Sequence, residues 1–224
     1  DAGVLGLVEL HAAGPELQKV LSDFDSKAWK AAATPSRDHH GRNAGGAALG
    51  VRRHIKYRSL CRLAARADQT LGQLRRRKPA PAFEAGPVDC HDFQALTTHM
   101  QGGPPTIVVL CLYDGLGATG VNIRKLQPVG VLVRGLQGDW MVIGDFNMPP
   151  EQLQQSAWPA EVQGEIAAPT DVAFSQHTGG RMLDCSAVGG IGVHRPCQLL
   201  AHVGGEFRSH VGLIAGVELG ASGR

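Results

Sequence analysis

Residues 139–147 read Asp-Trp-Met-Val-Ile-Gly-Asp-Phe-Asn and constrain the fold more than any other stretch. The apolar residues in its middle predict a short buried strand. Gly144 lets the backbone turn or pass close to a ligand. Side chains alternate along a strand, so Asp145 and Asn147 are expected on one face and Phe146 in the core. This pair suits a phosphate-hydrolysing site, because a carboxylate can orient a water and an amide can donate to an oxyanion.

The alternative is a strand end closed by an Asx turn, which needs no catalytic role. Pro149 and Pro150 stop the strand in either case, and Pro150 can open a helix at Glu151–Leu153.

Other segments predict more strands than helices and no regular βα alternation, which favours a two-sheet α/β sandwich. Helices are expected from Gly14-Pro15, over 58–75, and near 121–136, where Pro128 should kink or shorten the helix. The polar stretch 34–45 is expected to be a loop. Strands are expected at 3–9, 46–52, 106–113, 140–146, 181–188 and 211–219, with a weak segment near 164–175.

Gly-Asp-Phe-Asn at a strand end resembles the signature of the endonuclease/exonuclease/phosphatase superfamily, and further motifs of that superfamily follow in order. The matching segments are Val4–Glu9, Gly45–Val51, Ile107–Tyr113, Arg181–Asp184 and Ser209–Val211. The resemblance extends from about Ala2 to Leu219 and is closest to retrotransposon-type endonuclease domains. It implies a DNase I-like α/β fold, in which helices flank a two-layer β-sandwich, as one domain over 1–224 with a basic insertion at about 53–87.

The same resemblance implies metal-assisted hydrolysis of a phosphate ester, with Mg²⁺ as the cofactor and Mn²⁺ as a substitute. It assigns the metal to Glu9, the water-orienting role to Asp145, phosphate contacts to Asn147, His210 and Tyr113, and the orientation of His210 to Asp184.

Two departures predict weakened or lost catalysis. The family has a strand ending in Asn before the Glu9 strand, and we expect this first strand to be missing here. Ser209 stands where the family has an Asp, and a hydroxyl is a poorer Mg²⁺ ligand than a carboxylate. The alternatives to an endonuclease are a non-catalytic nucleic-acid-binding module and a phosphatase of small phosphate esters.

Ten of the 22 Lys and Arg residues lie between positions 52 and 78, against the single acid Asp68. A solvated helix face explains such a run, and so does a surface that neutralises the phosphates of DNA or RNA. The nucleic-acid-binding residues predicted from this run are Arg52, Arg53, Lys56, Arg75, Arg76, Arg77 and Lys78.

Gly115–Gly120 matches the dinucleotide-binding pattern Gly-x-Gly-x-x-Gly, but Pro128 should interrupt the following helix. The nearest acids after the motif are Asp139 and Asp145, and Asp145 already belongs to the Gly-Asp-Phe-Asn motif. No nucleotide cofactor is therefore expected.

The net charge of +2 says little about partners, and no apolar run is long enough to span a membrane. The five scattered cysteines fit neither a disulfide framework nor a zinc site. Without a visible signal peptide, an intracellular location within a longer polypeptide is favoured.

Overall fold

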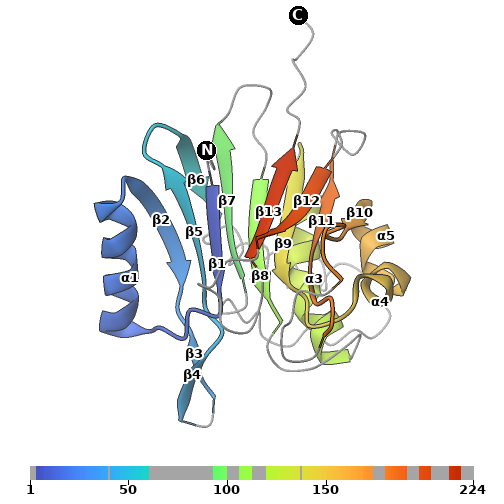
Figure 1. Cartoon of the computed structure of the whole chain (residues 1–224), viewed down its shortest axis with the longest axis horizontal. Helices are drawn as coiled ribbons and strands as arrows, with labels where there is room; N and C mark the ends of the chain where they lie inside the picture. Colours follow the sequence, from blue (N-terminus) through green and yellow to red (C-terminus); the bar gives the residue numbers. More distant parts are fainter. Residues whose placement is uncertain are drawn as a thin grey trace, which may run out of the picture.

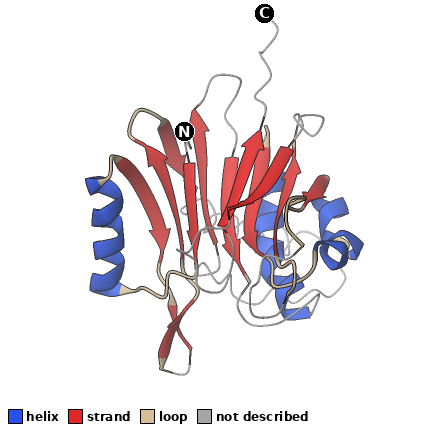
Figure 2. Ribbon diagram, viewed as in Figure 1, coloured by secondary structure: helices blue, strands red, loops and turns tan. Residues whose placement is uncertain are grey.

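The computed structural model describes residues 4–39, 41–60, 93–99, 106–112, 120–136, 138–173, 180–190, 197–202 and 212–217. Two β-sheets lie face to face in the middle of the molecule, and helices cover their outer faces (Figures 1 and 2). The expected α/β sandwich is therefore confirmed as a mixed α/β fold with several sheets. The single-domain boundaries and the missing first strand stay predictions.

The smaller sheet has the order β1-β5-β2, and all its neighbours are antiparallel. Its strands are β1 (Val4–Val8), β5 (Ala47–Arg52) and β2 (Trp29–Thr34). Helix α1 (Gly14–Ser26) covers its outer face, where Phe24 fills the space over Gly50.

The larger sheet has the order β10-β11-β9-β8-β7-β6, in which only β8 and β9 are parallel. Its strands are β10 (Gly164–Ala167), β11 (Asp184–Gly189), β9 (Trp140–Asp145), β8 (Thr106–Cys111), β7 (Phe93–His99) and β6 (Lys56–Ser59). Helices α3 (Gly120–Arg134), α4 (Pro150–Gln155) and α5 (Trp158–Val162) pack on its outer face. Two further pairs are β3 (Arg37–His39) with β4 (Arg42–Ala44), and β12 (Cys197–His202) with β13 (Gly212–Val217).

Two hydrophobic cores follow from this layering. Leu49 and Val51 of β5 meet Leu96 of β7 between the sheets. The larger core lies between the six-stranded sheet and its helices, where Val142, Leu126 and other apolar side chains are completely buried. Burying apolar surface is the main stabilising contribution to such a fold.

Three local expectations need correction. Residues 34–45 are not a plain loop, because they contain the β3–β4 hairpin. Helix 58–75 cannot begin at Arg58, since β6 runs to Ser59; residues 61–75 lie outside the described part of the chain. Pro128 does not shorten α3, which continues to Arg134 while Leu126 and Val133 are buried against the sheet.

One end of the sandwich gathers the predicted site residues, and we call it the site end. Val8 at the end of β1 pairs with Ala47, and so does Thr34 at the end of β2. The Thr34 hydroxyl donates to the carbonyl of Phe93, 3.0 Å away, in the larger sheet. Phe93 pairs with Leu110, which pairs with Gly144, and each of these two is one residue before the end of its strand. The carboxyl ends of β1, β2, β8 and β9 therefore lie at this end. No helix among the described residues is long and apolar enough to cross a membrane.

Candidate active site

Two carboxylates stand side by side at the site end. Asp145 is the last residue of β9 and Asp184 the first of β11, and they are direct partners in the antiparallel register. Only 4% of Asp145 and 5% of Asp184 is exposed. Partner side chains lie on the same face of a sheet, about 5 Å apart at Cβ. Like charges so placed and so little hydrated need positive charge or hydrogen-bond donors nearby.

Asn147 does not continue the strand, which corrects the expectation that it shares a strand face with Asp145. Its φ is 51°, a left-handed conformation that Asn tolerates better than most residues. Its backbone N–H donates to Oδ1 of Asp145 over 2.7 Å, so the Asx-turn alternative describes the local geometry. The turn does not exclude a role in catalysis, because the same hydrogen bond orients the Asp145 carboxylate.

The Asn147 side chain ties two strand ends together. Its Nδ2 donates to the carbonyl of Leu112 over 2.8 Å, and the Leu112 N–H donates to the carbonyl of Asp145 over 2.9 Å. A carboxamide nitrogen has two N–H groups, so one of them can still face a ligand. Nothing in the sequence indicated Leu112 as a partner, because a carbonyl oxygen is common to every residue type.

Gly144 is required by the close approach of β8. Its φ is 151°, and a Cβ at this position would lie 1.9 Å from the carbonyl oxygen of Leu110. Residues 110 and 144 are partners in the only parallel pair of the sheet. The Gly of Gly-Asp-Phe-Asn is thus explained by the neighbouring strand and not by a ligand.

Glu9 follows β1 at the site end and is half-buried. Its φ of 52° is unusual for a residue with a long side chain, and such strain concentrates at functional sites. The next residues are held in place by the two glycines before β5, because the Leu10 N–H donates to the Gly46 carbonyl and the His11 N–H to the Gly45 carbonyl. The backbone therefore holds Glu9 in its strained conformation.

Within the described ranges no three His, Cys, Asp or Glu side chains form a cation site, so the Mg²⁺ site expected at Glu9 stays a prediction. Mg²⁺ usually takes one or two protein carboxylates and completes its shell with waters and substrate phosphates. Glu9, Asp145 and Asp184 all lie at the site end, and coordination of Mg²⁺ by Glu9 there needs only water and substrate oxygens beside it.

Cys185 follows Asp184 in the sequence, but its side chain packs in the larger core. Burial and, after it, the carboxylates of Asp184, Asp145 and Glu151 hold the pKa of its thiol well above the usual range. The side chain is completely buried in the larger core, and its thiol stays protonated at neutral pH. A protonated, buried thiol is a poor nucleophile.

The described residues of the basic run lie at the opposite end of the sandwich. Arg52 stacks on the Trp29 ring at 4.4 Å, and Arg53 forms an ion pair with Asp25 at 2.7 Å. Arg52 lies five residues along β5 from Ala47, or about 17 Å from the site end. Lys56 opens β6 at the same far end. Nucleic-acid binding by these residues stays a prediction, and it would use a surface away from Asp145.

Several predicted site residues fall outside the described part of the chain. They are Tyr113, Ser209, His210, Arg75, Arg76, Arg77 and Lys78. The structure therefore brings Glu9, Asp145, Asn147 and Asp184 to one end, and the roles of the others stay predictions from the sequence.

This chain is similar to known proteins in its structure but not detectably in its sequence. No protein-family model and no curated protein matches the sequence. The catalytic domain of human Nocturnin matches with a TM-score of 0.53 at 15% identity, over 95% of this chain and 74% of that chain. The D. rerio TDP2 complexed with a single strand DNA product gives 0.53 at 11% identity, over 94% and 84%.

A third match is the endonuclease domain of TRAS1, a telomere-specific non-LTR retrotransposon. It gives a TM-score of 0.52 at 12% identity, over 84% of this chain and 80% of that chain. Identities this low establish a common fold and leave the activity open. The predicted resemblance is confirmed at the level of fold: the structure of this chain is similar to structures of endonuclease/exonuclease/phosphatase superfamily members.

Proposed function

We propose that this chain is a Mg²⁺-dependent phosphodiester hydrolase that acts on nucleic acid in the manner of an endonuclease. One observation carries the proposal: Asp145 and Asp184 are opposite each other, both almost completely buried, where the strands end. Buried carboxylates facing each other are costly in a purely structural role. A site that holds a cation and orients a water accounts for that cost.

The placement of Asp145 and Asn147 supports their proposed roles, and the sequence resemblance supplies the roles of the other side chains. Asp145, oriented by the Asn147 backbone N–H, accepts a proton from the attacking water. The second N–H of the Asn147 amide donates to a phosphoryl oxygen. Asp184 orients His210, and Tyr113 donates to the phosphate, as the sequence resemblance implies. Glu9 would hold Mg²⁺, which supplies Lewis-acid stabilisation of charge on the phosphate when bound. Mn²⁺ offers similar oxygen coordination and would substitute for it.

Nucleic acid is the favoured substrate because the description of one matched protein names a DNA product and that of another names an endonuclease. One is a TDP2 bound to a single strand DNA product, and the other is a retrotransposon endonuclease domain. This support is by analogy of fold, so a small phosphate ester is the competing substrate class.

Weakened catalysis is part of the proposal. Ser209 replaces the Asp that the family pattern has before its final His. Loss of one carboxylate would lower the affinity for Mg²⁺ and slow the reaction without changing the fold.

Nicking of supercoiled plasmid by the purified chain, with Mg²⁺ or with EDTA, tests the proposal. We expect slow Mg²⁺-dependent nicking that Asp145→Ala abolishes and Ser209→Asp accelerates. Glu165→Gln, which alters an exposed acid on β10, serves as the control and should nick like the parent chain. Nicking that survives Asp145→Ala would overturn the proposal. Hydrolysis of p-nitrophenyl phosphate without nicking would favour a small-molecule phosphatase, and Mg²⁺-independent DNA binding without cleavage would favour a binding module.

A further inference from the structure

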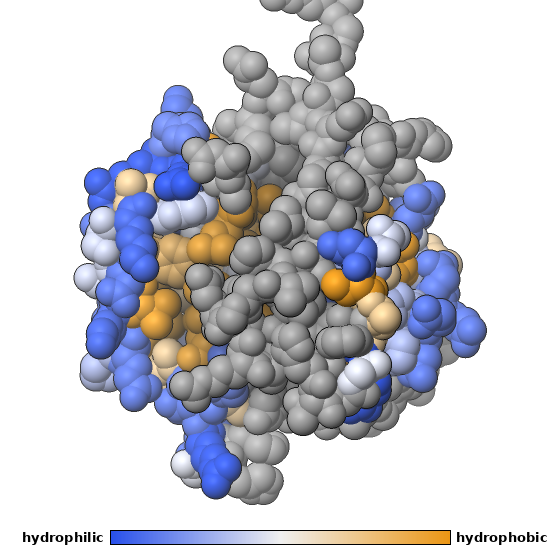
Figure 3. Space-filling model, viewed as in Figure 1, coloured by the Kyte–Doolittle hydropathy of each residue, from blue (hydrophilic) through white to orange (hydrophobic). Residues whose placement is uncertain are grey.

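The β3–β4 hairpin projects beyond the site end and carries two arginines. It begins three residues after Thr34, which ends β2 there. It is the lowest feature in Figures 1 and 3, and its described surface is hydrophilic. Arg42 is exposed and Arg37 is half-buried. The turn is closed by the Gly41 N–H, which donates to Oδ1 of Asp38 over 2.7 Å, so the one acid of the hairpin is engaged locally.

Hydrogen bonds hold this hairpin against the segment that follows Glu9. The Ser36 N–H donates to the Ala12 carbonyl over 2.9 Å. Nδ1 of His11 lies 2.9 Å from the carbonyl oxygen of Asn43, and Nδ2 of Asn43 donates to Glu16 over 3.4 Å. The hairpin is therefore held next to the segment that follows Glu9.

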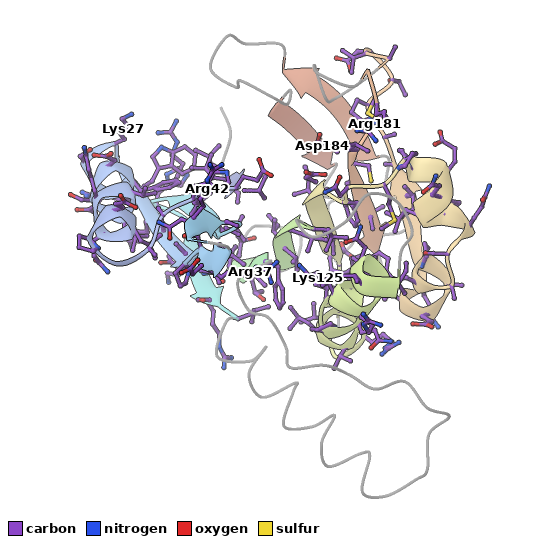
Figure 4. All side chains as sticks on the ribbon, turned by 90° about the horizontal axis from the view of Figure 1, so that it is seen from below. Lys27, Arg37, Arg42, Lys125, Arg181 and Asp184 are labelled. Carbon is purple, nitrogen blue, oxygen red and sulfur yellow. The ribbon has the colours of Figure 1, made fainter. Side chains whose placement is uncertain are left out.

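Cations on the larger sheet's side lie across from the hairpin. Arg181 is exposed three residues before Asp184, and Lys125 is half-buried on α3. Figure 4 looks onto the site end: Arg37 and Arg42 lie on the side of the smaller sheet, Lys125 and Arg181 on the other, and Asp184 between Arg42 and Arg181. We call Arg37, Arg42, Lys125 and Arg181 the basic rim.

We propose that the basic rim binds the phosphodiester backbone of a polynucleotide on both sides of the Asp145–Asp184 carboxylates. This inference rests on the proposed function for where the scissile phosphate lies. The rim comes from a hairpin, a helix and a loop that lie on both sides of the carboxylates. A polymer with a phosphate at every nucleotide presents negative charge on both sides at once. The carboxylates of the site repel such a polymer, and cations around them offset the repulsion at the distance of the neighbouring phosphates.

The proposal also separates the rim from the basic run at 52–78. Arg52 and Arg53 are at the opposite end of β5, where they contact Trp29 and Asp25. All four rim residues are Arg or Lys, whose side chains mostly contact phosphate oxygens, so the proposed contact is with the backbone.

Binding of a fluorescein-labelled 20-base-pair duplex, followed by anisotropy between 50 and 200 mM NaCl in EDTA, tests the proposal without any need for catalysis. The variants are Arg42→Ala, Arg181→Ala and their combination, and Lys27→Ala is the matched control. Lys27 is exposed after α1, at the end remote from the site. Arg42→Lys retains the charge and should restore most of the binding.

Each rim contact that is lost should reduce the slope of log K against log salt by about 0.9, which is about 3.5-fold in affinity over this salt range. The double variant should lose about 1.8 from the slope, and Lys27→Ala should lose nothing. Duplex RNA and single-stranded DNA of equal length distinguish the source of the backbone, and the same variants should weaken whichever is bound. A parent chain that binds none of them, or equal slopes for all variants, overturns the proposal. If the rim variants bind with reduced slopes but the parent chain does not nick plasmid, binding by the basic rim is supported and the proposed hydrolase function is rejected.

Discussion

Asp145 and Asp184 are register partners in the antiparallel pair β9–β11, and no more than 5% of either residue is exposed. The register places two carboxylates close together where the strands end, and like charges placed directly opposite each other repel. Removing one charge without changing shape should therefore stabilise the metal-free protein. We expect Asp145→Asn to raise the free energy of unfolding by up to about 1 kcal/mol at pH 7 in EDTA, measured by urea denaturation. The Asn side chain can still accept the hydrogen bond from the Asn147 N–H. A loss of stability instead would mean that the carboxylate is a structural ion-pair partner.

Gly144 should tolerate no side chain. A Cβ would lie 1.9 Å from the Leu110 carbonyl oxygen, so Gly144→Ala must push β8 and β9 apart and break part of their parallel pairing. We expect a loss of about 3 kcal/mol or more in the free energy of unfolding.

Gly180→Ala is the control for the glycine experiment. Its φ is also positive, at 57°, but no atom lies within 4 Å of the added Cβ. It should cost only about 1 kcal/mol of backbone strain. Equal effects of the two substitutions would show that strain, and not the approach of β8, makes Gly144 necessary.

Replacing Glu9 with glycine should stabilise the protein, whereas adding a side chain at Gly144 should destabilise it. Its φ of 52° strains any residue with a Cβ, so Glu9→Gly should raise the free energy of unfolding by about 1 kcal/mol. Glu9→Gln keeps the strain and should leave stability unchanged within about 0.5 kcal/mol. Both variants should lose Mg²⁺-dependent nicking. Full nicking by Glu9→Gln would remove Glu9 from the metal site.

The buried Cys185 thiol should make the free energy of unfolding fall as the pH becomes alkaline. Burial and the neighbouring carboxylates raise the pKa of the folded thiol, whereas an unfolded thiol ionises near pH 8.5. The folded state keeps the proton that the unfolded state releases, so this contribution is complete below about pH 8.5 and is lost progressively above it. We expect the parent chain to lose about 1 kcal/mol more than Cys185→Ala between pH 7 and pH 9.5, by urea denaturation. Identical losses would mean that the thiol ionises in the folded protein as easily as in the unfolded one.

The sequence predicted the parts of the fold that strong apolar runs encode. The strand before Asp145, the segment preceding Glu9 and the helix opened by Pro150 were all recognised from local pattern. Strand β2 was missed because its Ala-rich sequence has little intrinsic preference for a strand, and it forms through its pairing with β5. Strand β7 was missed as well, although Phe93, Ala95 and Leu96 are buried in it.

The candidate site was predicted by residue type but not by geometry. Alternation along an ideal strand placed Asp145 and Asn147 on one face, whereas the turn that Asp145 itself closes rotates Asn147 out of the strand. The pairing of Asp145 with Asp184 depends on the register of strands 39 residues apart, which no local pattern contains. The β3–β4 hairpin was not predicted for the same reason, because hydrogen bonds to the distant segment after Glu9 hold it in place.

The most direct test of the account is single-turnover cleavage of a labelled duplex DNA in Mg²⁺, by the parent chain and by Asp145→Asn, with enzyme in excess. Because Asp145→Asn should remain folded, a loss of activity cannot come from unfolding. We predict that the cleavage rate falls by about 100-fold or more, the size of the contribution of a catalytic base. Glu165→Gln should cleave at the parental rate. Cleavage by Asp145→Asn within about twofold of the parent chain would contradict the claim that the paired carboxylates at the site end form the active site.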